Sequence, residues 1–170
     1  MKVAICFVLA WFMATASPAF ARTPGEVEIG GVLREAHMQG LAGPSRKLSE
    51  FRGKPLIINV WASWCGPCRQ EMASLQRLAQ RGGKQFNVIG ISTDDYVDRA
   101  ELFLKVSNTT AFSNFIDSRL FLENMLGAER LPLTLLVDKQ GRVLAKVYGA
   151  QQWDSPAATT AISKAFGVKL

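Results

Sequence analysis

Two cysteines in the middle of the chain could carry out redox chemistry. They lie in the run Trp-Cys-Gly-Pro-Cys at positions 64–68, with two residues between Cys65 and Cys68. An apolar run ends just before them and a helical pattern follows, which places both at the first turn of a helix. The unpaired N–H groups and positive dipole end there favour a thiolate over a thiol. Cys65 would then be the attacking nucleophile, and Cys68 would resolve the mixed disulfide that it forms.

The number of cysteines favours redox chemistry over structural disulfides. The chain has three cysteines, and Cys6 lies in an N-terminal stretch that we expect to be removed. A disulfide between the other two would close a very short loop, which constrains the unfolded chain far less than a long loop does. Reversible thiol–disulfide exchange therefore explains the pair better than a structural role.

The start of the chain has the layout of a secretory signal peptide. Lys2 precedes an uncharged apolar stretch that ends in Ala-Phe-Ala at 19–21, which fits an Ala-X-Ala cleavage site. We therefore expect residues 1–21 to be a signal peptide and residues 22–170 to form one domain in the periplasm or another extracytoplasmic space. The alternative is an uncleaved inner-membrane anchor, because residues 3–21 carry no charge and could almost span a bilayer.

The composition argues against several other functions. The formal net charge is +6, from 20 basic and 14 acidic residues, but the basic residues are scattered, so a nucleic-acid partner is not expected. His37 is the only histidine, so a Ser-His-Asp or Cys-His enzyme would depend on it alone, and a multi-histidine zinc site is excluded. We expect no bound metal, and no cofactor other than the redox-active disulfide.

Apolar periodicity predicts the elements that position the cysteines. Residues 55–61 predict a strand buried on both faces, residues 66–80 an amphipathic helix, and residues 86–92 a second strand. Strand, helix and strand at this spacing form a βαβ unit with parallel strands.

The rest of the chain predicts further helices and strands around this unit. Asp94 and Asp95 could cap a helix that follows them. A short turn joins a strand at 131–137 to one at 142–148, and so short a connection demands an antiparallel hairpin. The other predicted elements are a hairpin with a helical turn at 37–51, a short strand at 115–116, a helix between Asp117 and Leu126, and a last helix capped at 154–156.

This order of elements resembles a thioredoxin-like fold, and more narrowly the exported thiol–disulfide oxidoreductases of the TlpA/ResA/DsbE type. The resemblance covers most of residues 40–165. It implies an α/β fold whose central mixed β-sheet is flanked by helices, with an extra N-terminal hairpin and a helical insertion before the cis-proline strand. Besides the highly specific active-site stretch at 59–68, weaker matching stretches occur in the family's order at 48–55, 69–72, 131–138 and 149–156.

The resemblance also implies roles for single residues. Cys65 resembles the family's attacking cysteine and Cys68 its resolving cysteine. Pro132 matches the cis-proline that lies beside the disulfide, and Leu131 would present its backbone to a substrate peptide. A cis peptide bond has a low free-energy cost only before proline, which agrees with this assignment. The residues expected to contact or support a substrate are Trp64, Gly66, Pro67, Leu131 and Pro132.

Two positions depart from the family pattern. Asn59 stands where ordinary thioredoxins have a buried acid that assists proton transfer, and an amide cannot titrate. Glu71 and Asp94 are candidates for that role, although their types and positions also fit an exposed helix residue and a helix cap. Ala73 stands where the family often has a helix-kinking proline, so a straighter helix is expected.

The sequence thus predicts an extracytoplasmic thiol–disulfide oxidoreductase that reduces protein disulfides, with apocytochrome c preparation as a typical family duty. The reducing direction is favoured because Gly-Pro separates the cysteines of reducing thioredoxins. We expect a monomer that acts on client proteins with disulfides or thiols and takes electrons from a membrane donor, since the compartment is oxidising. The alternatives are a thiol oxidase or disulfide isomerase and, from another class, a copper-binding or delivery module.

Overall fold

Strand β3 (Leu56–Trp61) runs through the sheet and leads directly to the cysteine pair. The computed structural model describes residues 25–170, so the predicted signal peptide at 1–21 lies outside the described residues. Every residue of β3 is buried, as predicted for a strand that is covered on both faces.

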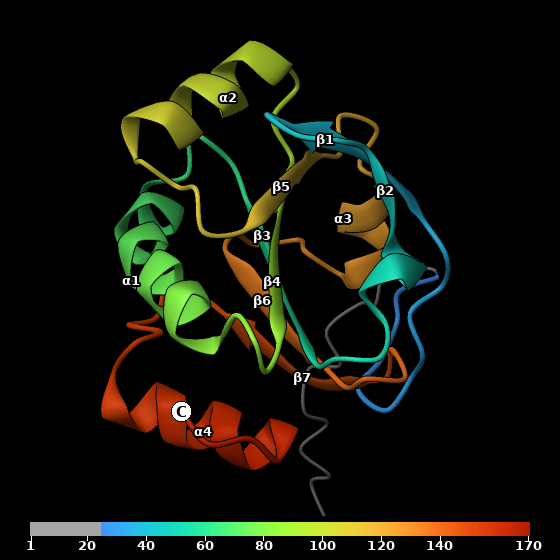
Figure 1. Ribbon diagram of the computed structural model, residues 1–170. Coiled ribbons are helices and arrows are strands. Elements are labelled where there is room, and N and C mark those ends of the chain that lie inside the picture. Colours follow the sequence, from blue (N-terminus) through green and yellow to red (C-terminus); the bar gives the residue numbers. More distant parts are fainter. Residues whose placement is uncertain (1–24) are drawn as a thin grey trace, which may run out of the picture.

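The other strands of the sheet are, in chain order, β1 (His37–Leu41), β2 (Arg46–Lys47), β4 (Asn87–Ser92), β5 (Ser113–Ile116), β6 (Leu133–Val137) and β7 (Val143–Tyr148). Their order across the sheet is β2-β1-β5-β4-β3-β6-β7 (Figure 1). β3 pairs parallel with β4, which confirms the predicted βαβ unit. β6 pairs antiparallel with both β3 and β7, which confirms the predicted hairpin and makes the sheet mixed.

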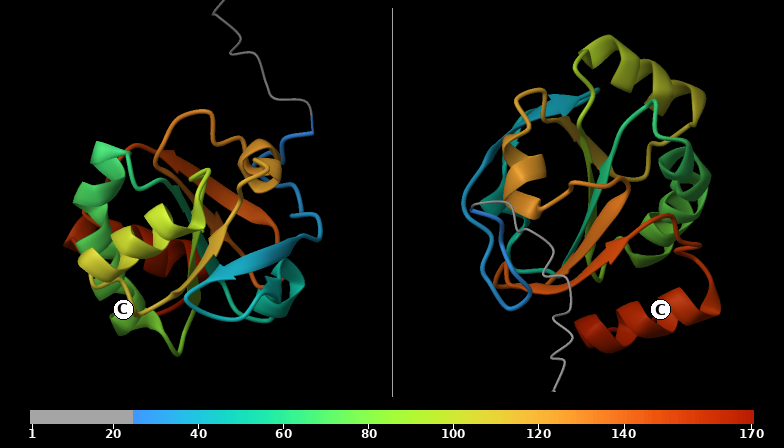
Figure 2. Two further views of the ribbon diagram at one scale, coloured as in Figure 1. Left: turned by 90° about the horizontal axis from the view of Figure 1, so that it is seen from above. Right: turned by 180° about the vertical axis from the view of Figure 1, so that it is seen from behind.

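Helices cover both faces of this sheet. They are α1 (Gly66–Gly82), α2 (Val97–Val106), α3 (Phe121–Leu126), α4 (Pro156–Phe166) and the 3₁₀ helix η1 (Leu48–Phe51). Figures 1 and 2 show α1, α2 and α4 over one face, and α3 and η1 over the other. Within residues 25–170, no helix has the length and apolar character needed to cross a bilayer.

The alternation of side chains along β3 decides which residues lie beneath the cysteines. Ile57 and Trp61 belong to the core under α1, whereas Ile58 and Val60 belong to the core on the opposite face. Because side chains alternate along a strand, Asn59 faces α1 with Ile57 and Trp61. Asn59 is therefore placed against the helix that carries the cysteine pair.

Some predicted boundaries and caps differ from the structure. β6 begins at Leu133, two positions later than expected, and the two residues before it, Leu131 and Pro132, are joined by a cis peptide bond. The prediction that Asp94 and Asp95 cap α2 is wrong: the N-cap is Tyr96, and no side chain caps this helix. In α4, by contrast, the side chain of the N-cap Ser155 accepts a hydrogen bond from a backbone N–H, as predicted.

We expect Gly90→Ala to lower the free energy of unfolding by about 1–3 kcal/mol through overpacking. A Cβ at this position of β4 would lie 2.0 Å from Oδ1 of Asn114 and 2.7 Å from Nε1 of Trp61, which are hydrogen-bonded to each other at 3.1 Å. Urea unfolding measures the effect. Gly43→Ala is the control, since the nearest atom to its added Cβ is 4.0 Å away. Equal losses in the two variants would contradict the packing argument.

Candidate active site

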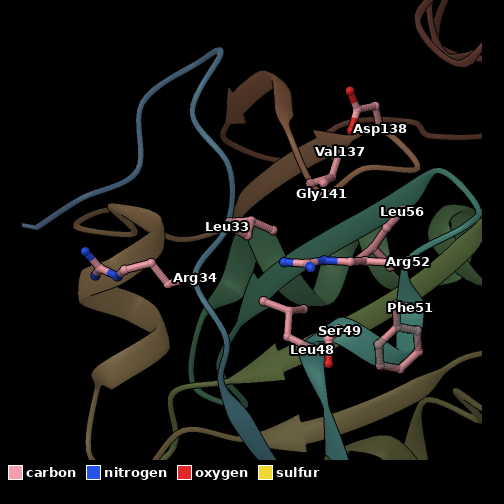
Figure 3. A pocket seen from close by; sticks show the side chains of 10 residues that line it. All are labelled: Leu33, Arg34, Leu48, Ser49, Phe51, Arg52, Leu56, Val137, Asp138 and Gly141. Carbon is pink, nitrogen blue, oxygen red and sulfur yellow. The ribbon is translucent and has the colours of Figure 1, made fainter.

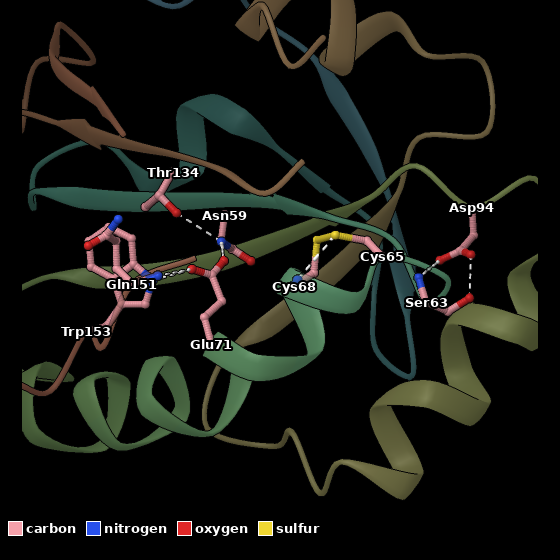
Figure 4. The surroundings of a disulfide bond; sticks show 9 residues. All are labelled: Asn59, Ser63, Cys65, Cys68, Glu71, Asp94, Thr134, Gln151 and Trp153. Atoms are coloured by element: carbon pink, nitrogen blue, oxygen red, sulfur yellow. Dashed lines mark hydrogen bonds between the residues drawn. A yellow bond between two sulfur atoms is a disulfide. The ribbon is translucent and has the colours of Figure 1, made fainter. Parts of the chain in front are cut away.

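Cys65 and Cys68 form a disulfide at the N-terminus of α1 (Figure 4), with an S–S distance of 2.05 Å. Cys65 is the N-cap residue, and its Sγ accepts a hydrogen bond from the backbone N–H of Cys68 at 3.2 Å. Pro67 lies in the first turn, where a missing N–H leaves no helical hydrogen bond unmade. This is the predicted placement, and the N–H groups at a helix start favour negative charge on the sulfur.

The two sulfurs differ in their access to a partner. Cys65 is 5% exposed and lines an open groove of about 800 Å³, whereas Cys68 is completely buried. Trp64, with 70% of its surface exposed, forms part of the same groove, while Trp61 lies in the core. Of the two cysteines, only Cys65 can therefore meet a large molecule without rearrangement.

A distant part of the chain also lines the groove. Residues 128–131 border it together with residues 64–67, so Leu131 and the active-site turn share one groove. The cis peptide bond of Pro132 follows Leu131 directly, as expected. Acidic side chains not singled out from the sequence also line the groove, and burial together with the nearby Asp117 carboxylate raises the pKa of Glu123.

A buried polar cluster lies beneath the disulfide (Figure 4). Glu71 is at its centre and is 1% exposed, so the alternative interpretation of this residue as an exposed helix residue is wrong. Its Oε1 accepts a hydrogen bond from Nδ2 of Asn59 at 2.7 Å. Its Oε2 accepts from Nε1 of Trp153 at 2.9 Å and from the backbone N–H of Gln151 at 3.1 Å.

Burial dominates the electrostatics of Glu71. It raises the pKa of this carboxyl group above its ordinary value of 4.5, because the charged form is poorly solvated there. The hydrogen bonds from Trp153, Asn59 and Gln151 oppose the shift without cancelling it. A carboxyl group held in this way can exchange a proton closer to neutral pH than an exposed glutamate can.

Asp94 lies on the other side of the disulfide and holds the turn before Cys65. It is 1% exposed. Its carboxylate accepts hydrogen bonds from the backbone N–H of Ser63 at 2.9 Å, from Oγ of Ser63 at 2.6 Å and from Oγ of Ser92 at 2.7 Å. Asp94 thus joins the end of β4 to the segment that delivers Cys65, which replaces the predicted helix-cap role with a tertiary one.

Another pocket is unconnected with this chemistry. It lies near the start of β3 and the end of β6 (Figure 3). The cysteines follow the other end of β3. The pocket's volume of about 10 Å³ corresponds to about one water molecule. Within residues 25–170, no group of three or more His, Cys, Asp or Glu side chains is placed to hold a metal ion.

Comparison with known proteins decides the family. The model of the Redoxin family matches residues 18–163, which is most of the chain. The chain belongs to the Redoxin family. Its Cys-X-X-Cys disulfide and its relatives make it a thiol–disulfide oxidoreductase of the DsbE/ResA type, which confirms the resemblance noted from the sequence.

Two similar proteins and a solved structure support this assignment. The thiol:disulfide interchange protein DsbE of Vibrio cholerae is 30% identical over 78% of this chain and 73% of its own length. The thiol-disulfide oxidoreductase ResA of Geobacillus thermodenitrificans is 29% identical over 72% of this chain and 71% of its own length. A crystal structure from Chlorobium tepidum, assigned as thiol:disulfide interchange protein DsbE, has a TM-score of 0.76 and 27% identity, and covers 84% of this chain and all of that one.

Several residues of this Redoxin-family site were not indicated by the sequence. Thr134 and Trp153 join the cluster around Asn59 and Glu71 from positions far along the chain. Trp153 lies in one of the matching stretches, but nothing in its local pattern shows that its ring nitrogen reaches a glutamate 82 positions away. The cross-strand pairing of Thr134 with Asn59 could have been found only by knowing the register of β3 and β6.

Proposed function

We propose that this oxidoreductase reduces disulfides in client proteins outside the cytoplasm. The observation that carries the proposal is the Cys65–Cys68 disulfide at the start of α1, with Cys65 alone lining the groove. In the reduced protein, the sulfur of Cys65 would react with a client disulfide, and the buried sulfur of Cys68 would react afterwards with the mixed disulfide. Reduction of client disulfides, for example during cytochrome c maturation, would regenerate the oxidised pair.

The chemical steps balance within the cysteine pair and the client. The thiolate of Cys65 attacks a client disulfide, forms a mixed disulfide and releases one client sulfur as a thiolate. Cys68, after losing its proton, attacks Sγ of Cys65 and releases the second client sulfur. The client gains two electrons and, with solvent protons, two thiols, while the protein ends in its disulfide form.

The groove would bind the client around its disulfide. Trp64, Gly66 and Pro67 line the groove beside Cys65 in the chain, and Leu131 lines the same groove. Pro132 would set the direction of the backbone at Leu131, so that an extended client segment can pair with it as an added strand. The exposed ring of Trp64 offers apolar contact area next to the reacting sulfur.

Glu71 is a better candidate than Asp94 for proton transfer with Cys68. Glu71 lies on the same helix as Cys68, is connected through Asn59 to the region beneath the disulfide, and has a raised pKa. The oxygens of Asp94 are already engaged by Ser63 and Ser92, and Asp94 lies on the far side of Cys65. We therefore assign the exchange of protons to Glu71 and the support of the active-site turn to Asp94.

The compartment and electron supply follow from the N-terminal sequence. Residues 1–21 would direct export to the periplasm, either as a cleaved signal or as a membrane tether. In that oxidising space the disulfide of a reductase must be reduced again after each reaction. A membrane protein that supplies electrons is therefore the expected donor.

The equilibrium of the cysteine pair with glutathione tests the reducing direction. We expect a standard potential nearer to the about −270 mV of thioredoxin than to the about −120 mV of a strongly oxidising dithiol protein. The ratio of oxidised to reduced protein in glutathione buffers measures it, with the Cys68→Ser variant as the control that cannot form the disulfide. A potential near the oxidising end would instead support the alternative of a thiol oxidase or isomerase.

A further inference from the structure

We propose that Asn59 is a positioning residue for the resolving cysteine: when the pair is reduced, Oδ1 of Asn59 accepts a hydrogen bond from the thiol of Cys68. The inference rests on the proposed function, in which the pair alternates between disulfide and dithiol. Its starting point is that Oδ1 is fully buried and has no hydrogen-bond partner within residues 25–170. Most buried polar atoms are paired, and an unpaired acceptor is costly.

The hydrogen bonds of the side-chain nitrogen of Asn59 fix the direction in which Oδ1 points. Nδ2 donates to Oε1 of Glu71 at 2.7 Å and to Oγ1 of Thr134 at 2.9 Å. Both of these contacts are made by the nitrogen of the amide and not by its oxygen. Oδ1 is therefore turned away from both partners, and Figure 4 shows it on the side of the Cys68 side chain.

The fold places the two groups on facing surfaces. Asn59 projects from β3 toward α1, and Cys68 and Glu71 are three residues apart on α1, so they share one face of the helix. One amide between them can bond to both. Because Cys68 is completely buried, a thiol formed there must find its acceptor among protein atoms.

The redox state determines whether this hydrogen bond exists. In the disulfide, Cys68 carries no hydrogen, so Oδ1 has no donor there. Reduction by a dithiol breaks the S–S bond, transfers two electrons and two protons to the pair, and converts the dithiol to a disulfide. The new S–H of Cys68 can then satisfy Oδ1, so Asn59 stabilises the reduced state relative to the oxidised one.

The same contact distinguishes the two cysteines after reduction. An acceptor oxygen stabilises a thiol and repels a thiolate, so Asn59 keeps Cys68 protonated, whereas Cys65 receives a backbone N–H that favours its thiolate. Of the titratable groups on this helix, Cys65 lies three residues before Cys68 and Glu71 three residues after it. On the sheet, the side chains of this cluster are Asn59 and Thr134, and neither titrates near neutral pH.

The S–H stretching band of Cys68 tests the contact directly. An infrared difference between Cys65→Ser and the Cys65→Ser/Cys68→Ser double variant isolates this band. We expect the frequency of a hydrogen-bonded thiol when Asn59 is present, and that of an unbonded thiol after Asn59→Leu. Thr134→Val is the matched control, because it removes a partner of Nδ2 and leaves Oδ1 in place.

The equilibrium with glutathione gives a second readout. One buried hydrogen bond corresponds to roughly a tenfold change in an equilibrium constant. We therefore expect Asn59→Leu to shift the equilibrium about tenfold toward the disulfide, which is about 30 mV for two electrons. If Asn59 acted only by orienting Glu71, the shift would vanish in a Glu71→Met background, and we expect it to persist there.

The outcomes separate this inference from the proposed function. An unbonded Cys68 thiol in the presence of Asn59, or a shift that disappears in the Glu71→Met background, overturns the inference. Neither measurement needs a client, so a bonded thiol in a protein that fails to reduce clients rejects only the proposed function. If Asn59→Leu does not fold, Asn59→Ala replaces it, since its side chain likewise has no acceptor for the Cys68 thiol.

Discussion

Replacing Cys65 with serine is expected to lower the rate of insulin-disulfide reduction to that of dithiothreitol alone. A serine hydroxyl is essentially un-ionised at neutral pH and cannot form a mixed disulfide. Because Cys65 is the sulfur that lines the groove, the buried Cys68 cannot take over its role. The turbidity of precipitating insulin B chain, followed with pre-reduced protein, measures the effect.

The Cys68→Ser variant separates attack from resolution. It keeps the attacking sulfur, so it is expected to accumulate a mixed disulfide with a client while losing turnover. Non-reducing electrophoresis followed by mass spectrometry would identify the trapped protein and the cysteine that holds it. Full insulin reduction by the Cys65→Ser variant, or trapping that does not depend on Cys65, would contradict the assignment of the nucleophile.

Replacing Glu71 with alanine is expected to destabilise the oxidised protein by roughly 3–5 kcal/mol at neutral pH. The substitution removes the acceptor of three N–H donors: the buried side-chain donors of Asn59 and Trp153, and the partly buried backbone N–H of Gln151. Loss of each hydrogen bond to a buried donor costs about 1–3 kcal/mol, and water entering the space recovers part of the total. Urea unfolding of the disulfide form measures the change.

The raised pKa of Glu71 also predicts the sign of a pH dependence. Its folded pKa lies above the unfolded value of about 4.5, so the folded protein binds this proton more tightly than the unfolded chain does. The stability that this proton contributes is fully present below pH 4.5 and is lost as pH rises through the folded pKa. Glu71→Gln cannot ionise, so its stability relative to the unmodified protein should increase as pH rises across this range.

An exposed glutamate provides the control for this pH dependence. The backbone N–H of Lys47, and then the side chain of Arg46, lower the pKa of Glu50. The stability that Glu50 contributes is therefore present above its unfolded pKa and is lost as pH falls through its folded pKa. The stability of Glu50→Gln relative to the unmodified protein should thus decrease as pH rises, opposite to the trend for Glu71→Gln. A difference between the Glu71→Gln variant and the unmodified protein that does not change with pH would contradict a raised pKa at Glu71.

Much of the fold could be predicted because it depends on local patterns. The apolar run of β3, the helical spacing after Gly66 and the short turn before β7 are each readable within about a dozen residues. They were enough to predict the βαβ unit, the antiparallel hairpin and the position of the cysteines at the start of α1. The cis-proline was expected from the family resemblance, and it is present in the structure.

The burial of Glu71 illustrates where local patterns fail. Its position three residues after Cys68 and one before Met72 lies on the buried stripe of α1, but a charged side chain is normally exposed. Its partners Trp153 and Gln151 follow β7 and reach α1 only after the sheet has formed. Asp94 was likewise read as a cap of the helix next to it, whereas its partners lie on the other side, at Ser63 and Ser92.

The chemistry of the Cys-X-X-Cys pair was therefore evident from residue types and spacing alone, because a helix N-terminus favours a thiolate in any fold. The surroundings that tune this pair required the folded chain. Asn59, Glu71 and Thr134 meet beneath the disulfide only because a strand, a helix and an antiparallel neighbour pack together in one register. Hydrogen bonds and burial between residues so distant in sequence leave no local pattern, and they decide how the buried cysteine holds its proton.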